Sequence, residues 1–160
     1  MNESKQYSMS VLQMTAGFES LALVAYQKMI NGKLDKWTCG FGHTGDDVYK
    51  RVTCDRAQAL RWLQEDIQWA ERVVRAFVKN VNLTQGEFDA LVDFTFNCGS
   101  GNLEHSTLLK LVNAGQFEAA AKEFEKWNKC DGKACAGLLR RRLAEEAEFD
   151  GKDISHQETT

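Results

Sequence analysis

The apolar side chains in the middle of this chain recur at helical spacing. They fall on one face of a helix with 3.6 residues per turn: Leu60, Leu63, Ile67, Ala70, Val74 and Phe77. The chain contains no proline, so no residue in this segment removes a backbone donor or kinks the helix. We therefore expect one uninterrupted helix over about 53–80, joining two smaller parts of a 160-residue chain.

A helix and a hairpin are predicted before this long helix. Apolar residues at helical spacing predict a helix over 10–20. The dipeptide Asn31-Gly32 is a strong signal for a tight hairpin turn. The flanking residues predict strands over about 25–29 and 34–41.

The second predicted strand carries a threonine and glycines in alternation. Because side chains alternate along a strand, Thr38 would share one face with Gly40 and Gly42. The residues between them, which include Cys39 and Phe41, would then face the core. We expect the Thr38 face to be open and lined by glycine.

Helices dominate the second half of the chain. Thr84 and Glu87 form a capping-box pattern at the start of a buried helix, and Ser106 or Thr107 starts a shorter one. The expected organisation is a hairpin lobe over about 20–52, the connecting helix over 53–80, a helical lobe over 81–150 and a flexible tail over 151–160. This order predicts an α+β fold that is mainly α.

Composition excludes several classes of protein. A net charge of -3 argues against a dedicated nucleic-acid binder. No apolar run approaches the roughly 20 residues that span a bilayer, and the first ten residues lack the apolar core of a signal peptide. We expect synthesis in the cytoplasm without a stable membrane anchor. The 5 cysteines do not form a disulfide scaffold, although Cys130 and Cys135 share a loop and could pair in an oxidising compartment.

Ordered motifs along nearly the whole chain resemble those of the phage-type lysozymes (endolysins, glycoside hydrolase family 24). They are Phe18-Glu19, Ala25-Tyr26, the strand Trp37-Thr38-Cys39-Gly40-Phe41-Gly42-His43-Thr44, Leu83-Thr84-Gln85, Phe96-Asn97-Cys98-Gly99-Ser100-Gly101, Ser106-Thr107-Leu108-Leu109, and Gly137-Leu138-Leu139-Arg140-Arg141-Arg142. Each motif alone is weak. Their shared order makes the resemblance specific.

The resemblance implies a glycosidase site in which Glu19 is the general acid and Thr38 helps to hold the attacking water. The family also has an aspartate in the hairpin. In the family this aspartate comes nine residues after the glutamate and six before the threonine. Nine residues after Glu19 is Lys28, whereas six before Thr38 is Gly32. The two positions differ because this hairpin is longer than the family pattern. Asp35 is the one carboxylate within the predicted hairpin. It either replaces the missing aspartate or is a solvated turn residue. Asp46 and Asp47 are further candidates, but their surroundings in the sequence look like a surface loop.

The resemblance also assigns roles in the second half of the chain. It places Phe96, Asn97 and Thr107 near the glycan-binding groove, although Phe96 could equally belong to the core. It suggests that Arg140 or Arg141 pairs with Glu19, while a solvated basic face is the alternative. His43 is expected to be structural, since no partner ligands lie at metal spacing.

The function implied by this resemblance is a muramidase that hydrolyses the β-1,4 bond between N-acetylmuramic acid and N-acetylglucosamine and lyses a bacterial host. The expected protein is a monomer without cofactor or metal. It would be made in the host cytoplasm and would reach the periplasm and cell wall through a holin. Two alternatives are a glycosidase of the same fold acting on chitin-like chains and a catalytically silent lysozyme fold that binds glycan or protein.

Overall fold

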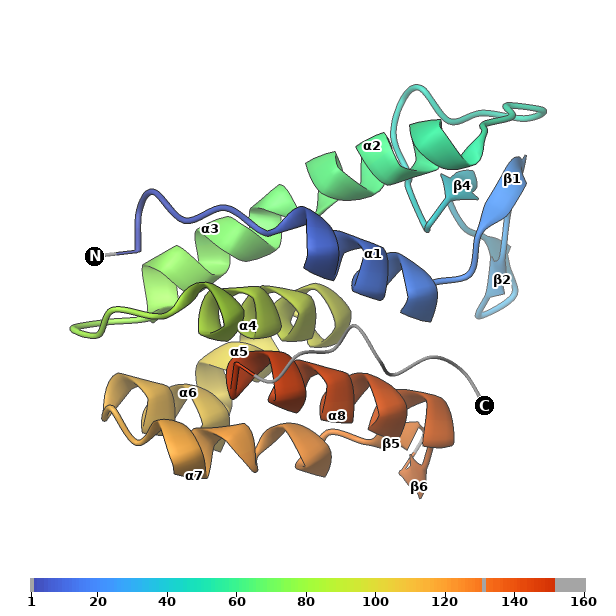
Figure 1. The fold of residues 1–160 in the computed structure, drawn as a ribbon. Coiled ribbons are helices and arrows are strands. Elements are labelled where there is room, and N and C mark those ends of the chain that lie inside the picture. The colour runs from blue at the N-terminus through green and yellow to red at the C-terminus, as the bar shows by residue number, and fades with distance from the viewer. Residues whose placement is uncertain (1, 131, 152–160) are drawn as a thin grey trace. The chain divides into compact units, whose positions relative to one another are not determined.

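A computed structural model describes residues 2–130 and 132–151, and its chain path is shown in Figure 1. The chain divides into two units. One is Met9–Gln68, and the other combines Met1–Ser8 with Trp69–Thr160. The α+β, mainly α class is confirmed, because helices make up most of the described elements.

The first unit contains two helices and short strands. In chain order these are α1 (Met9–Phe18), β1 (Ala22–Tyr26), β2 (Met29–Ile30), β3 (Lys33–Leu34), β4 (Thr38–Gly40) and α2 (Arg56–Asp66). The tight turn is confirmed: Asn31 and Gly32 have φ of 51° and 76°, the two positive values that such a turn requires. β1 begins at Ala22, earlier than expected, because it pairs with β4 rather than continuing straight into the turn.

The second unit is a group of helices with one small hairpin. Its elements are α3 (Gln68–Phe77, whose first residue closes the other unit), α4 (Gln85–Cys98), α5 (Ser100–His105), α6 (Thr107–Asn113), α7 (Phe117–Ala121), η1 (Phe124–Lys126), β5 (Lys129–Cys130), β6 (Lys133–Ala134) and α8 (Ala136–Phe149). Both Thr84 and Glu87 make their capping-box hydrogen bonds, and Ser106 caps α6. Both predicted helix starts are therefore confirmed.

The prediction of one uninterrupted helix over 53–80 is wrong. The structure has two helices, α2 and α3, separated at Ile67. Ile67 keeps right-handed angles (φ -71°, ψ -17°), and its N–H still donates to the Leu63 carbonyl oxygen at 3.0 Å. Ile67 is also buried. Since the apolar stripe stays in step across the break, its periodicity could not reveal the interruption.

Other elements differ from the sequence prediction. α5 and the β5–β6 hairpin were not predicted, and the chain between α6 and β5 forms two short helices, α7 and η1. The dipeptide Asp131-Gly132 is a hairpin signal that could have revealed β5 and β6. The predicted tail over 151–160 lies outside the described residues except for Gly151.

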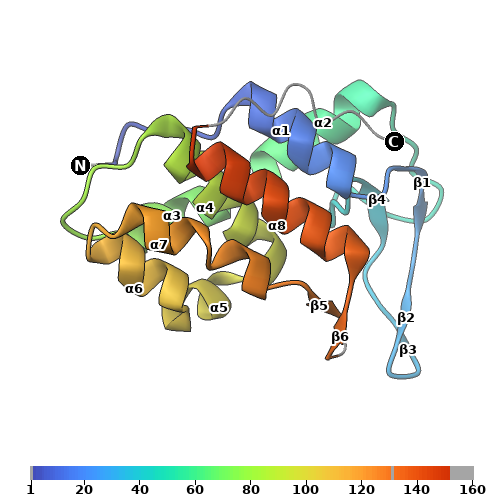
Figure 2. The same ribbon diagram turned by 60° about the horizontal axis from the view of Figure 1, so that its bottom comes forward.

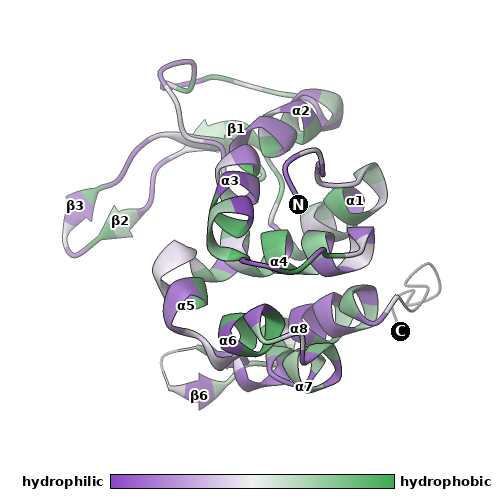
Figure 3. Ribbon diagram, turned by 90° about the vertical axis from the view of Figure 1, so that its left-hand side faces the viewer, coloured by the Kyte–Doolittle hydropathy of each residue, from purple (hydrophilic) through white to green (hydrophobic). Residues whose placement is uncertain are grey.

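The last helix packs against α4, although its sequence is largely hydrophilic, as the purple of α8 in Figure 3 shows. Three charged residues of α8, Arg141, Arg142 and Glu145, are nevertheless buried. Buried charges require partners, so this helix indicates a polar network inside the helical unit. Among the residues that the structure describes, no helix combines the length and the apolar character needed to cross a membrane.

Candidate active site

The proposed general acid lies where the first helix gives way to the sheet. Glu19 follows α1 directly, and its N–H donates to the Thr15 carbonyl oxygen at 3.2 Å, which keeps it on the last helical turn. Its side chain is half-buried. The strand that follows, β1, pairs with β4, the strand that carries Thr38. The first unit therefore supplies both Glu19 and Thr38 from adjoining elements.

Thr38 and Asp35 lie at different distances from the turn of the hairpin. Thr38 pairs with Tyr26, is half-buried, and donates its hydroxyl to the Lys36 carbonyl oxygen at 3.3 Å. Asp35 is exposed, and its N–H donates to the carbonyl oxygen of Lys28 at 2.8 Å. Asp35 and Lys28, two of the residues considered for the family's aspartate position, thus lie opposite one another, and both are closer to the turn than Thr38.

The expected open, glycine-lined face of β4 is wrong. Gly40 is buried and ends β4 with a φ of 64°, so the alternation of side chains stops there. A Cβ added to Gly40 would lie 3.1 Å from the Cβ of Ala59 on α2. Gly40 is therefore required for close packing of β4 against α2, and only Gly42 of the two glycines is exposed.

His43 is buried and is the centre of a polar cluster that the sequence did not reveal. Its Nδ1 lies 2.9 Å from both carboxylate oxygens of Asp66, and its Nε2 lies 3.1 Å from Asp47 Oδ1. The imidazole stacks on Trp62, with ring centroids 4.7 Å apart. These contacts fix the loop after β4 to α2, which is consistent with the structural role predicted for His43.

The contacts between His43 and the two aspartates also shift the pKa values of His43 and Asp66. Burial lowers the pKa of His43, but hydrogen bonds and charges from Asp66 and Asp47 outweigh burial, so its pKa is raised above 6.5. Burial raises the pKa of Asp66 more than His43 lowers it. A group whose pKa is raised by folding stabilises the fold below its unfolded pKa, and that contribution is lost as the pH rises through the folded value.

We therefore expect the stability that His43 contributes to depend on pH. The loss in unfolding free energy caused by His43→Gln should be larger at about pH 6 than at about pH 9, measured by urea unfolding at both values. His105→Gln is the matched control, since His105 is exposed on α5. An equal loss at both pH values would contradict the assignment of a stabilising charged imidazole.

The predicted glycan-binding residues lie around the end of α4 and the start of α6. Asn97 is exposed, whereas Phe96 is half-buried and packs near Trp69, with ring centroids 6.4 Å apart. Thr107 is exposed on the first turn of α6. A pocket of about 510 Å³ in this unit is lined by Asn97, Cys98, Asn102, Lys126, Trp127, Lys129 and Leu138. Of the three predicted binding residues, Asn97 is the one that lines this pocket.

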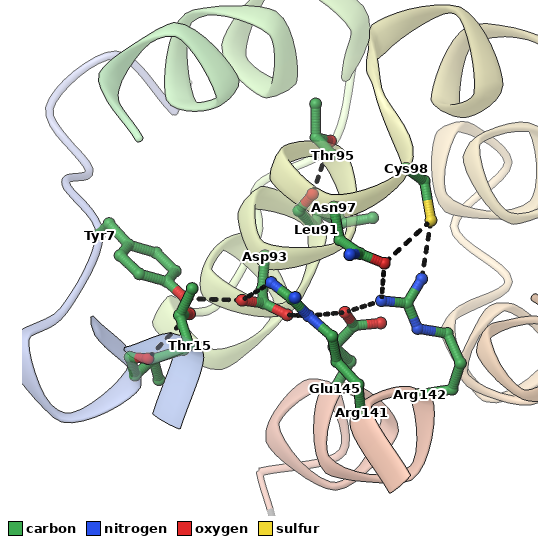
Figure 4. Close-up of polar contacts among 11 residues, drawn as sticks. Tyr7, Thr15, Leu91, Asp93, Thr95, Asn97, Cys98, Arg141, Arg142 and Glu145 are labelled. Atoms are coloured by element: carbon green, nitrogen blue, oxygen red, sulfur yellow. Dashed lines mark hydrogen bonds and ion pairs between the residues drawn. The ribbon is translucent and has the colours of Figure 1, made fainter. Parts of the chain in front are cut away.

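Two of the three consecutive arginines are buried in a charged network (Figure 4). Arg141 binds both carboxylate oxygens of Asp93, through Nε at 2.8 Å and Nη2 at 3.0 Å. Arg142 binds Glu145 at 2.6 Å. Arg140, the other predicted partner of Glu19, is exposed. The pairing of Glu19 with Arg140 or Arg141 stays a prediction.

The network continues to the end of α4. Arg142 also donates to Asn97 Oδ1 at 2.9 Å and to the sulfur of Cys98 at 2.7 Å. Burial and the nearby charge of Asp93 raise the pKa of Glu145 well above its ordinary value, against the opposing effect of Arg142. No pattern of neighbouring residues in the sequence marks Asp93, Arg142 or Glu145 as a buried residue. Because Arg142 holds Asn97, the network positions one side of the pocket.

The described part of the chain contains no group of three or more His, Cys, Asp or Glu side chains that could hold a metal ion. Glu19 can donate a proton, and Thr38 can orient a water molecule by hydrogen bonding.

Comparison with known proteins gives a consistent result. A family model described as phage lysozyme matches residues 16–145. The endolysin of Bacillus phage B103 is 39% identical over 153 residues, which cover 94% of this chain. Those residues cover 57% of the phage protein, so the chain spans little more than half the length of that relative.

Solved structures are similar over almost the whole chain. The muramidase domain of SpmX from Asticaccaulis excentricus has a TM-score of 0.79 and 30% identity, covering 91% of this chain and 97% of that domain. The lysozyme of phage P22, solved as a mutant, has a TM-score of 0.78 and 30% identity, covering 90% and 97% of the two chains.

Proposed function

Because the chain belongs to the phage lysozyme family, we propose that it is a muramidase that hydrolyses the β-1,4 bond between N-acetylmuramic acid and N-acetylglucosamine in peptidoglycan. The observation that carries this proposal is the position of Glu19. It stands at the end of α1, half-buried, where the chain enters the strand that pairs with the Thr38 strand. The decisive experiment is the Glu19→Gln substitution described below.

In the proposed reaction, Glu19 protonates the glycosidic oxygen as the bond breaks. Charge builds on the sugar ring in an oxocarbenium-like transition state, and water attacks the anomeric carbon. Thr38 orients this water through its hydroxyl. Water supplies the oxygen of the new hydroxyl group, so the reaction needs no cofactor.

The second carboxylate of the site is assigned to Asp35, as the hairpin residue available to replace the family's aspartate. Asp35 lies opposite Lys28 and closer to the turn than Thr38, so it is not level with the hydroxyl that would hold the water. Its role therefore needs a direct test. If Asp35 activates water, Asp35→Asn should lower hydrolysis of purified peptidoglycan by about 10²-fold or more. Release of reducing ends measures this rate.

Two comparisons make the Asp35 test decisive. Asp46→Asn removes another exposed carboxylate of the same unit and should leave the rate unchanged. Thr38→Val should slow hydrolysis because it removes the hydroxyl but keeps the shape. An Asp35→Asn rate equal to wild type would exclude Asp35 from the chemistry, and the water would then be held by Thr38 without a hairpin carboxylate.

Peptidoglycan binding is assigned to the helical unit through Phe96, Asn97 and Thr107. Asn97 supports this assignment, because Arg142 holds it at the edge of the pocket. The biological partner is then the glycan strand of the cell wall. We further propose a monomer that is made in the host cytoplasm and reaches the periplasm through a holin.

The rival function is a catalytically silent lysozyme fold that binds glycan or another protein. Lys28 at the counted aspartate position is the observation that favours it. Sedimentation with insoluble peptidoglycan, combined with the release of reducing ends, separates the two functions. A silent binder would sediment with the wall and release none, whereas the muramidase should do both.

A further inference from the structure

The small β5–β6 hairpin carries two cysteines on the same face. Cys130 pairs with Lys133, and the N–H of Cys135 donates to the Asn128 carbonyl oxygen at 2.8 Å. In a two-stranded ribbon, side chains of directly paired residues point to the same side. Along one strand, every second side chain also points to that side, so Cys135 shares the side of Lys133 and Cys130. Cys130 and Cys135 therefore occupy diagonal positions on one face, and the Cys130 thiol forms a hydrogen bond with the Cys135 sulfur.

The surroundings of Cys135 favour its thiolate form. It immediately precedes α8, and Figure 2 shows the hairpin running directly into that helix. A hydrogen bond from Cys130 and backbone N–H groups of Leu138 and Gly137 lower the pKa of Cys135. Cys130 is exposed and Cys135 is partly exposed, so an oxidant can reach the pair. Thiolates, not thiols, attack disulfides.

A second pair of cysteines in the chain has the opposite character. The sulfurs of Cys39 and Cys54 are 3.4 Å apart in the first unit, and both donate to the Ala22 carbonyl oxygen. Cys39 is fully buried, and burial raises the pKa of Cys54 to about 11. The two sulfurs are close, but the burial of Cys39 and the raised pKa of Cys54 disfavour their oxidation, so distance alone does not decide which pair reacts.

We propose that Cys130 and Cys135 form a redox-active dithiol, which oxidised glutathione converts to an intramolecular disulfide while Cys39 and Cys54 stay reduced. The Cys135 thiolate attacks one sulfur of oxidised glutathione and releases one glutathione thiolate. Cys130, deprotonated, then attacks the Cys135 sulfur of the mixed disulfide and releases the second. The protein loses two electrons and two protons, and one oxidised glutathione becomes two reduced glutathiones.

The disulfide would join β5 to the residue that precedes α8, next to the pocket. Lys129 on β5 and Leu138 on the first turn of α8 both line this pocket, and the cysteines lie between them in the chain. Oxidation therefore cross-links the ribbon to the start of the helix. We expect slower amide hydrogen exchange over residues 128–138 in the oxidised protein, because the cross-link restricts local opening.

The test starts from the fully reduced protein in a glutathione redox buffer, followed by intact mass and mapping of disulfide-linked peptides. The wild type should lose the mass of two hydrogen atoms, with a single link between Cys130 and Cys135. Cys130→Ser should stop at the mixed disulfide and carry one glutathione on Cys135. Cys54→Ser is the matched control from the Cys39–Cys54 pair and should oxidise like the wild type.

Alkylation with iodoacetamide gives a second readout. In the reduced protein, Cys135 should react at least about tenfold faster than Cys39, Cys54 or Cys98. A link that maps to Cys39 and Cys54, or equal alkylation of all five cysteines, would overturn the proposal. Both readouts are independent of hydrolysis, so a failure here is distinguishable from a failure of the muramidase assignment.

Discussion

Glu19→Gln is expected to lower the hydrolysis of peptidoglycan by 10²–10⁴-fold while the fold stays intact. The amide keeps the size and shape of the side chain but cannot deliver a proton to the glycosidic oxygen, and general acid catalysis contributes about this factor. The rate is measured as loss of turbidity of outer-membrane-permeabilised bacteria and as release of reducing ends. Thermal unfolding of the same preparation should match the wild type.

Glu65→Gln provides the control for this experiment, because Glu65 is an exposed glutamate on α2 in the same unit. It should retain wild-type activity. A Glu19→Gln protein that kept more than about a tenth of the wild-type rate would remove Glu19 from the role of general acid. A wild-type protein that binds the wall but releases no reducing ends would instead favour the silent binder.

The second large effect concerns stability. Asp93→Ala is expected to lower the free energy of unfolding by about 3–5 kcal/mol, because it leaves the Arg141 guanidinium buried without its bidentate partner. Asp93 is fully buried, and Arg141 is 3% exposed. The remaining carboxylate of the network, Glu145, lies 3.7 Å from Arg141 and already binds Arg142 at 2.6 Å. Urea unfolding monitored by tryptophan fluorescence measures the change.

Two further variants test this explanation. Glu104→Ala removes an exposed carboxylate from α5 and should change stability by less than about 0.5 kcal/mol. The double variant Asp93→Leu with Arg141→Met should recover much of the loss, since replacing both partners of a buried ion pair leaves no unpaired charge. If Asp93→Ala were as stable as Glu104→Ala, the network would not be a stabilising element of this fold.

Features that depend only on neighbouring residues could be predicted from the sequence. The turn at Asn31-Gly32 and the caps at Thr84 and Ser106 were predicted correctly, because each is fixed by hydrogen bonds and backbone angles within a few residues. The apolar stripe predicted the buried face of α2 and α3, because the spacing of apolar residues follows the 3.6-residue period of a helix. It did not predict the interruption at Ile67, which leaves that face unchanged.

Which polar residues are buried and paired depends on contacts between elements that are distant in the sequence. Asp93 and Arg141 are 48 positions apart in the chain, and His43 and Asp66 are 23 apart, so no local pattern links them. Three consecutive arginines look alike in the sequence, yet Arg140 is exposed while Arg141 and Arg142 are buried. The packing of α8 against α4 makes that difference, because a charged side chain is stable in the interior only where another element brings it a partner.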